Sequence, residues 1–218
     1  MEGWEKATTI AELQEAIKDC RLCPLGETRT NLVLGTGNEH AEIMFVGEAP
    51  GYHEDKQGIP FVGPAGQFLD QLLQSIGLKR SEVYIANTLK CRPPENRDPL
   101  PEELATCTPY LFKQIEIIKP RIICTLGNHA TKTLLQTNTG ITQLHGKLVR
   151  REGLAYVPLF HPAAALHKPP LKGVLIDDFQ MLHEHLVAER ARWKDSEEGE
   201  AAGTSLEAEA QPEQMGLF

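Results

Sequence analysis

The sequence contains no long hydrophobic run. No apolar stretch approaches the ~20 residues that a membrane-spanning helix needs. Residues 1–18 are polar with helical periodicity, so they lack the charged, apolar and small-residue order of a secretory signal. We therefore expect a cytoplasmic protein with no membrane segment.

Cysteine is also scarce, with five residues in a chain of 218. A reducing cytoplasm disfavours disulfides, so these cysteines are more typical of a metal site or of the protein core.

A surplus of basic residues is absent as well. The chain has 22 Lys and Arg against 30 Asp and Glu, and seven of the acidic residues lie between residues 195 and 218, where there is no Lys or Arg. The rest of the chain is nearly neutral, so the acidity does not argue against nucleic-acid binding. The composition predicts one domain over residues 1–194, a disordered acidic tail over residues 195–218, and a monomer.

Strand and helix patterns alternate along the domain. Predicted strands cover residues 42–46, 82–87, 121–127 and 155–160, and the main predicted helices cover residues 65–76, 101–118, 128–135 and 171–193. This order predicts an α/β fold, a three-layer α/β/α sandwich around a central, mostly parallel four-stranded sheet.

The loop after the first predicted strand is the most distinctive segment. Gly47-Glu48-Ala49-Pro50-Gly51 is followed by Gly58-Ile59-Pro60-Phe61-Val62-Gly63. Glycines let a backbone approach a flat ligand, prolines stiffen the loop, and Phe61 supplies an aromatic face. Because α/β proteins bind ligands at the carboxyl ends of their strands, the loop predicts a base-binding pocket. The alternative is an ordinary strand-to-helix connection with Phe61 in the core.

Two further side chains are expected at the same sheet edge. Asn87 ends the second strand, and its amide offers the donor and the acceptor that a pyrimidine edge requires. His161 follows the fourth strand, where an imidazole is well placed for catalysis. Taken singly, Asn87 is explained as a turn residue and His161 as a partner of a backbone carbonyl. Their convergence with the Gly47 loop and Phe61 favours a ligand site.

Four cysteines have the spacing of metal ligands. Cys20 and Cys23 form a C-x-x-C hook, while Cys91 and Cys107 are widely spaced single residues. The pattern is consistent with an iron–sulfur cluster, with structural zinc, or with unligated thiols. Cys124 lies within an apolar strand and is expected in the core.

With these motifs assembled, the chain resembles the iron–sulfur uracil-DNA glycosylases of family 4. The resemblance covers about residues 20–186 and rests on the cysteine hook, GEAPG with EDKQGIPFVGPAG, YIANTLKCRPPENR, the cysteine at 107, and HPAAAL. It implies a uracil-DNA glycosylase of base excision repair that acts on uracil-containing DNA. It also implies a [4Fe-4S] cluster held by Cys20, Cys23, Cys91 and Cys107, with a structural rather than a redox role.

The resemblance assigns roles in the pocket too. Phe61 would stack on a flipped uracil, Asn87 would read its edge, and His161 would bond to uracil O2. The remaining pocket residues would be Gly47, Glu48, Ala49 and Glu54, with Glu54 in the space that a thymine methyl needs.

Ala49 departs from the broader superfamily, where the first motif often carries Asp or Asn to position water. Catalysis would then rest on the leaving group, because bond cleavage places negative charge on uracil O2 and a preset donor from His161 stabilises it. Glu48 is the remaining candidate for orienting water. Residues 91–97 lack the long basic, histidine-containing insertion of the branch that crosslinks to DNA, so we expect a monofunctional hydrolase.

A base inside a duplex must be extruded before it can react. Leu166 is the candidate wedge that fills the gap, although it would equally serve to pack its loop onto the last helix. Arg92 and Lys168 are candidate phosphate contacts.

The chain ends in Gln214-Met215-Gly216-Leu217-Phe218, which resembles the bacterial sliding-clamp-binding pentapeptide. Such a tether would raise the effective concentration of the protein at replicating DNA. Two other functions stay open: a non-catalytic iron–sulfur or zinc DNA-binding or regulatory protein, and a glycosylase of broader deaminated-base specificity.

Overall fold

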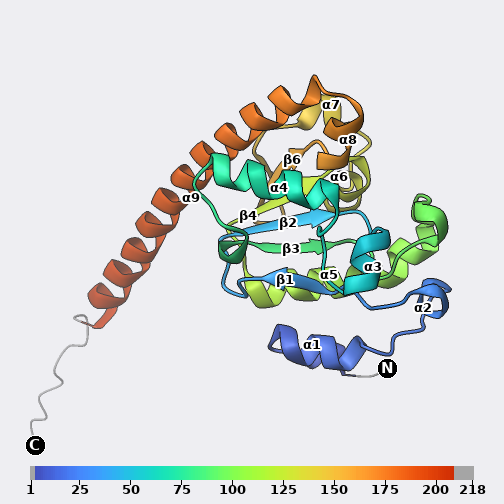
Figure 1. Cartoon of the computed structure of the whole chain (residues 1–218). Helices are drawn as coiled ribbons and strands as arrows, with labels where there is room; N and C mark the ends of the chain where they lie inside the picture. The colour runs from blue at the N-terminus through green and yellow to red at the C-terminus, as the bar shows by residue number, and fades with distance from the viewer. Residues whose placement is uncertain (1–2, 209–218) are drawn as a thin grey trace, which may run out of the picture.

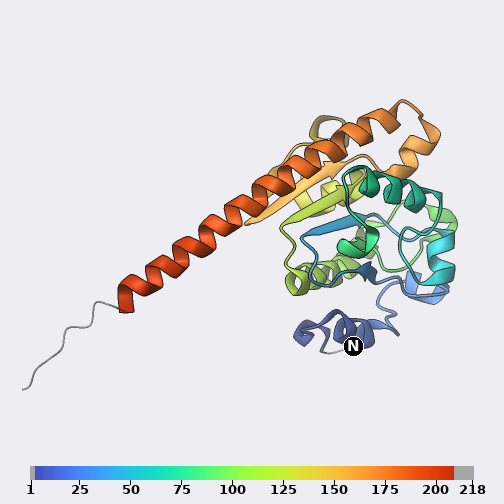
Figure 2. The same cartoon turned by 60° about the vertical axis from the view of Figure 1, so that its left-hand side comes forward.

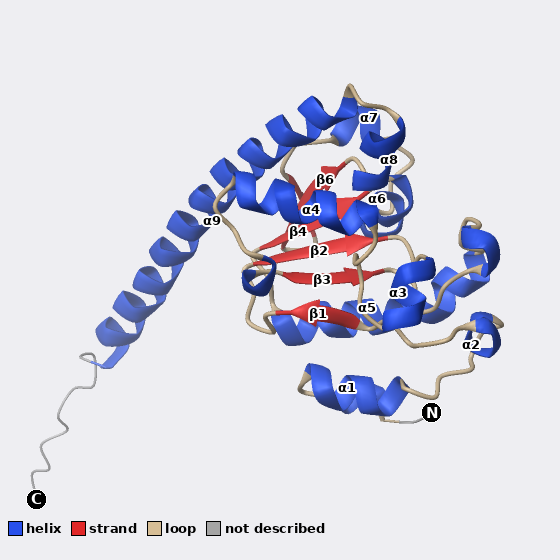
Figure 3. Ribbon diagram, viewed as in Figure 1, coloured by secondary structure: helices blue, strands red, loops and turns tan. Residues whose placement is uncertain are grey.

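A six-stranded mixed sheet lies between two layers of helices in the computed structural model (Figures 1 and 3). Residues 3–208 are described, with side chains through Trp193. The strands are β1 (Gly35–Gly37), β2 (Ile43–Gly47), β3 (Tyr84–Asn87), β4 (Ile122–Leu126), β5 (Val149–Arg151) and β6 (Leu154–Leu159). The helices are α1 (Ile10–Ile17), α2 (Leu25–Thr28), α3 (Tyr52–Gln57), α4 (Pro64–Ser75), α5 (Pro101–Ile118), α6 (Asn128–Leu135), α7 (Ile141–Leu144), α8 (Pro162–His167) and α9 (Leu171–Ala208).

The strand order is β1-β3-β2-β4-β6-β5, and the four inner strands are parallel. The predicted fold class is therefore confirmed. The predicted strand number is wrong, because β1 and β5 add antiparallel edges. Both edge strands have only three residues and no apolar pattern, being Gly-Thr-Gly and Val-Arg-Arg. Gly37 is required in β1, since a Cβ there would lie 2.0 Å from the Val83 carbonyl oxygen.

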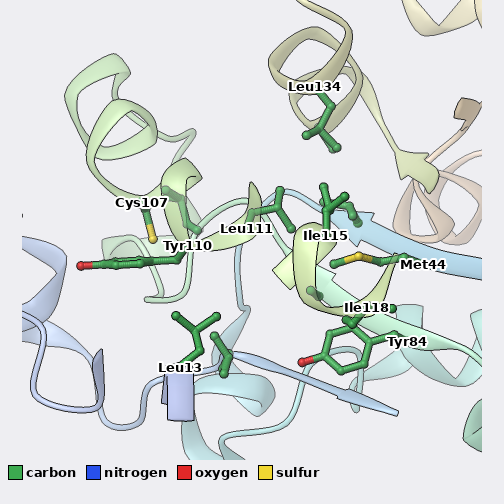
Figure 4. Packing of buried hydrophobic residues seen from close by; sticks show 14 of the residues in the cluster. Leu13, Met44, Tyr84, Cys107, Tyr110, Leu111, Ile115, Ile118 and Leu134 are labelled. Atoms are coloured by element: carbon green, nitrogen blue, oxygen red, sulfur yellow. The ribbon is translucent and has the colours of Figure 1, made fainter. Parts of the chain in front are cut away.

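Successive side chains of the central strands point to opposite faces of the sheet, and this divides the core into two halves. Met44 and Val46 of β2 face a cluster with α1, α5 and α6, part of which Figure 4 shows. Ile43 and Phe45 face the other cluster, formed with α4, α8 and α9. Cys124 is fully buried in this second cluster, which confirms the prediction that it is a core residue.

Helix α9 is longer than the sequence predicted. It runs beyond Trp193 to Ala208 and projects from the body of the molecule (Figures 1 and 2). Up to Ala208 the backbone of the acidic segment is helical, as its Ala and Glu content favours, and the disorder of the tail stays a prediction. Residues 209–218, which include the clamp-like pentapeptide, lie outside the described residues. No helix in the described part of the chain has the length and apolar character needed to cross a membrane.

Candidate active site

The site is built at the carboxyl ends of β2 and β3, beside α3 (Figure 1). Gly47 and Asn87 are paired in register as the last residues of these parallel strands. A Cβ on Gly47 would lie 2.4 Å from Asn87 Oδ1 and 2.7 Å from Phe61 Cζ. The glycine therefore lets an amide and an aromatic ring approach each other.

A cavity of about 360 Å³ opens at this edge, a size typical of small-molecule sites. It brings together seven residues singled out from the sequence, namely Glu48, Ala49, Gly51, Glu54, Phe61, Asn87 and His161. Three lining residues had not been expected: Ala65, Asn96 and Ala163.

Phe61 is held in an unusual backbone conformation. Its φ is 53°, in the left-handed region that a bulky side chain rarely adopts. The ring is buried and stacks on the His161 imidazole, with centroids 5.6 Å apart and planes at 28°. Such strain persists where the surroundings determine the conformation, which is common in ligand sites.

Glu54 anchors the loop that carries this ring. Its Oε1 accepts hydrogen bonds from the backbone amides of Val62 at 2.9 Å and Gly63 at 2.8 Å. The Glu54 carboxylate thus fixes the loop that carries Phe61. The exclusion of a thymine methyl by Glu54 stays a prediction.

Asn87 presents a buried acceptor that lacks a partner. The residue is 2% exposed, and within the described chain its Oδ1 accepts no hydrogen bond. An unsatisfied buried acceptor costs about 1–3 kcal/mol, so this oxygen is suited to a donor on a ligand.

The position of the His161 proton follows from its surroundings. His161 precedes α8 as its N-cap, and its Nδ1 accepts a hydrogen bond from the Ala163 amide at 3.1 Å. The neutral ring therefore carries its proton on Nε2. Burial lowers the pKa of His161 to about 4, against a smaller opposing effect of Glu54. At neutral pH the ring is an uncharged hydrogen-bond donor.

Glu48 has two ionisable neighbours that were not expected as site residues. His129 Nε2 lies 3.9 Å from Glu48 Oε2 and 3.7 Å from Asp98 Oδ2. Burial raises the pKa of Glu48, the charge of His129 lowers it, and that of Asp98 raises it further. A sequence signal existed only for His129, which follows a predicted strand and so belongs at the same sheet edge.

Comparison with known proteins identifies the family. Residues 34–180 match the model of the uracil DNA glycosylase superfamily. The chain belongs to this superfamily. It is 45% identical over 185 residues to a type-4 uracil-DNA glycosylase of Sulfurisphaera tokodaii, covering 81% of this chain and 84% of the relative. A type-4 enzyme of Archaeoglobus fulgidus is 46% identical over 184 residues, covering 81% and 92%. One of Thermotoga maritima is 43% identical over 172 residues, covering 77% and 90%.

Four thiols form a second group in this superfamily member. Cys20, Cys91 and Cys107 are buried, Cys23 is half-buried, and all are free of disulfides. Cys91 interacts electrostatically with Cys20 and Cys23, and Cys107 with Cys91 and Cys23. Burial raises the pKa of Cys107 to about 12 and also raises that of Cys91.

Hydrogen-bonding groups approach three of these sulfurs. The Cys91 sulfur accepts from Arg29 Nη1 at 3.3 Å, and the Cys107 sulfur accepts from the Lys90 amide at 3.2 Å. The Tyr110 hydroxyl lies 3.5 Å from the Cys20 sulfur. Lys90 also links the thiols to the pocket, because its buried ammonium donates to the Asn87 carbonyl at 2.7 Å.

The predicted DNA contacts lie outside the cavity lining. Leu166 on α8 is 41% exposed, and Lys168 is exposed just beyond that helix. Arg92 lies over the exposed ring of Tyr52, with its guanidinium carbon 5.3 Å from the ring centroid. Its Nε donates to Asn96 at 2.7 Å, so Arg92 reaches the rim of the pocket through a lining residue. The roles of all three in DNA binding stay predictions.

Proposed function

We propose that this chain is a DNA-repair enzyme that extrudes uracil from DNA and hydrolyses its N-glycosidic bond, leaving an abasic site. Type-4 uracil-DNA glycosylases that are 43–46% identical over most of the chain support this function. In the pocket, the observation that carries the proposal is Asn87 Oδ1 beside Phe61, which has no hydrogen-bond partner among the described residues. Uracil N3–H supplies a donor for this oxygen, whereas cytosine N3 is an acceptor and does not.

The pocket residues then divide the reaction between them. Phe61 stacks on the flipped base, and the Nε2–H of His161 donates to uracil O2. As the C1′–N1 bond breaks, charge grows on O2, so this hydrogen bond strengthens in the transition state. The neutral imidazole of His161 stabilises this charge by donating a hydrogen bond, and it keeps its proton while doing so. Glu48 is the carboxylate placed to orient the attacking water and to take its proton, since Ala49 has no ionisable group.

We further propose that Cys20, Cys23, Cys91 and Cys107 hold a [4Fe-4S] cluster. Four thiols, three of which have a hydrogen-bonding group at the sulfur, are the ligand set that such clusters use. Tetrahedral zinc with Zn–S bonds of about 2.3 Å would place its sulfurs about 3.8 Å apart. Among the described residues no three of these sulfurs lie within 4.8 Å of one another, which favours the larger cluster. When bound, the cluster would crosslink the amino-terminal segment, the loop after Asn87 and α5.

Release of free base from oligonucleotides tests the function. Strands carrying uracil, hypoxanthine, xanthine or a mismatched thymine should lose only uracil, and His161→Ala should slow this loss. Loss of the other deaminated bases as well would indicate the broader glycosylase. DNA binding without release of any base would indicate a non-catalytic protein.

The carboxyl-terminal pentapeptide Gln214–Phe218 remains a predicted contact for a sliding clamp. Deleting residues 214–218 should weaken binding to a purified clamp and leave uracil release unchanged. Equal clamp binding with and without the segment would rule the contact out.

A further inference from the structure

Three ionisable side chains from separate segments meet beside the pocket. Glu48 follows β2, Asp98 lies in the segment before α5, and His129 lies in the first turn of α6. Their nearest ligand-type atoms all lie within 4.8 Å of one another. The imidazole of His129 is the one basic group in this set, and it lies within 4 Å of both carboxylates.

We propose that His129 is a positioning residue that holds the Glu48 carboxylate in place and in its ionised form, and that Asp98 opposes it. The inference rests on the proposed role of Glu48 in orienting and deprotonating water. It assigns to the reaction two residues, His129 and Asp98, that do not line the cavity.

The physical basis is the balance of charges around a half-buried carboxylate. Removal from water disfavours the charged form of Glu48, and the coulombic effect of the basic His129 side chain at 3.9 Å favours it. The charge of Asp98 acts against ionisation, although this side chain is 84% exposed and therefore partly screened by solvent.

Two other ionisable groups face the same cavity, Glu54 from α3 and His161 from the start of α8. The Glu54 carboxylate is bound to the amides of Val62 and Gly63, and His161 is neutral. Neither group therefore replaces His129 as a positive neighbour of Glu48.

The test is the pH dependence of uracil release under single-turnover conditions, measured with one uracil-containing oligonucleotide. Glu48 acts as a base only when it is ionised, so the rate should fall as the pH drops through its pKa. His129→Gln removes the basic group whose coulombic effect favours the ionised form of Glu48, and it should move the midpoint of this fall to higher pH. Asp98→Asn removes a negative charge and should move it to lower pH. A shift of roughly 0.5–1 pH unit is expected for one charge at this distance in a partly solvated site.

Controls separate electrostatics from damage to the fold. His129→Lys retains a basic side chain, so the midpoint of its pH profile should lie closer to the wild-type value than that of His129→Gln. His183→Gln, at an exposed position of α9, should leave the profile unchanged. If His129→Gln does not fold, the exposed Asp98→Asn still decides the question by the direction of its shift.

Equal profiles for wild type, His129→Gln and Asp98→Asn, or shifts in the same direction, would overturn the inference. Glu48→Gln distinguishes this outcome from a failure of the underlying role, because it should remove the acidic fall in rate altogether. A fall that persists in Glu48→Gln would show that Glu48 is not the base, and the His129 proposal would fall with it. Uracil release itself would still stand.

Discussion

At the scale of single residues, the pocket depends on the absence of a side chain at Gly47. In Gly47→Ala the new methyl group would overlap Asn87 Oδ1 and the Phe61 ring, so both must move. Displacing binding groups by about 1 Å can cost roughly 10²-fold in rate, and we expect kcat/KM for uracil release to fall by about that factor. Gly173→Ala is the matched control, because nothing lies within 4 Å of its Cβ position in α9. This control should retain activity and gain up to about 1 kcal/mol of stability in urea unfolding.

His161 leads to a residue-scale prediction about stability and pH. Its pKa is about 4 in the folded protein, against about 6.5 for an unperturbed histidine. As the pH falls from 6.5 toward 4, the unfolded chain binds a proton at this site and the folded chain does not. The free energy of unfolding should therefore decrease over this window, by at most about 3 kcal/mol and by less in a partly exposed site. His161→Gln should flatten this slope in denaturant unfolding, whereas an unchanged slope would contradict an imidazole that is neutral in the folded protein. The exposed His183→Gln should keep the wild-type slope.

At the scale of secondary-structure elements, an aromatic pair contributes to the packing of α9 on the sheet. Phe179 is fully buried and stacks on Phe45 of β2, with centroids 5.8 Å apart and planes at 9°. Phe179→Ala should lower the free energy of unfolding by about 3–5 kcal/mol through lost burial and a cavity. Ile176→Ala, on the same helix but 44% exposed, should cost less than about 1 kcal/mol. Similar losses for the two variants in urea unfolding would mean that α9 is not docked through this face.

The elements also show how far the sequence alone determines the fold. The four parallel strands were predictable because each is an apolar run followed by Gly, Asn or His. The strands β1 and β5 were not, since three-residue edges carry no periodicity and form only against a neighbouring strand. Asn87 and His161 were expected at one edge because they lie at the ends of predicted strands, and Phe61 because it lies in the loop after the first predicted strand. The contacts of His129 with Glu48 and Asp98 were not predictable, because they depend on loop conformations far apart in the sequence.

At the scale of the whole molecule, the four thiols come from three separate segments of the chain. Cys20 and Cys23 follow α1, Cys91 follows β3, and Cys107 lies in α5. If these thiols bind a cluster, folding and metal binding are coupled, because thiolates buried together are unfavourable without a cation. Cys107→Ala should lose iron, visible absorption and several kcal/mol of stability. Cys124→Ala is the control, since this thiol is buried in the opposite half of the core and should keep its iron.

The same variants separate a structural cluster from a redox-active one. In the structural case, loss of iron should lower activity only as far as it disturbs the segment from Asn87 to Cys91, where the Lys90 ammonium holds the Asn87 carbonyl. Reduction of the intact cluster should then leave single-turnover uracil release unchanged, because charge develops on the base and not on the sulfurs. The measurement is uracil release before and after anaerobic reduction, with iron content determined in the same samples. A rate that collapses while the iron is retained would require an electron-transfer role that the hydrolysis does not need.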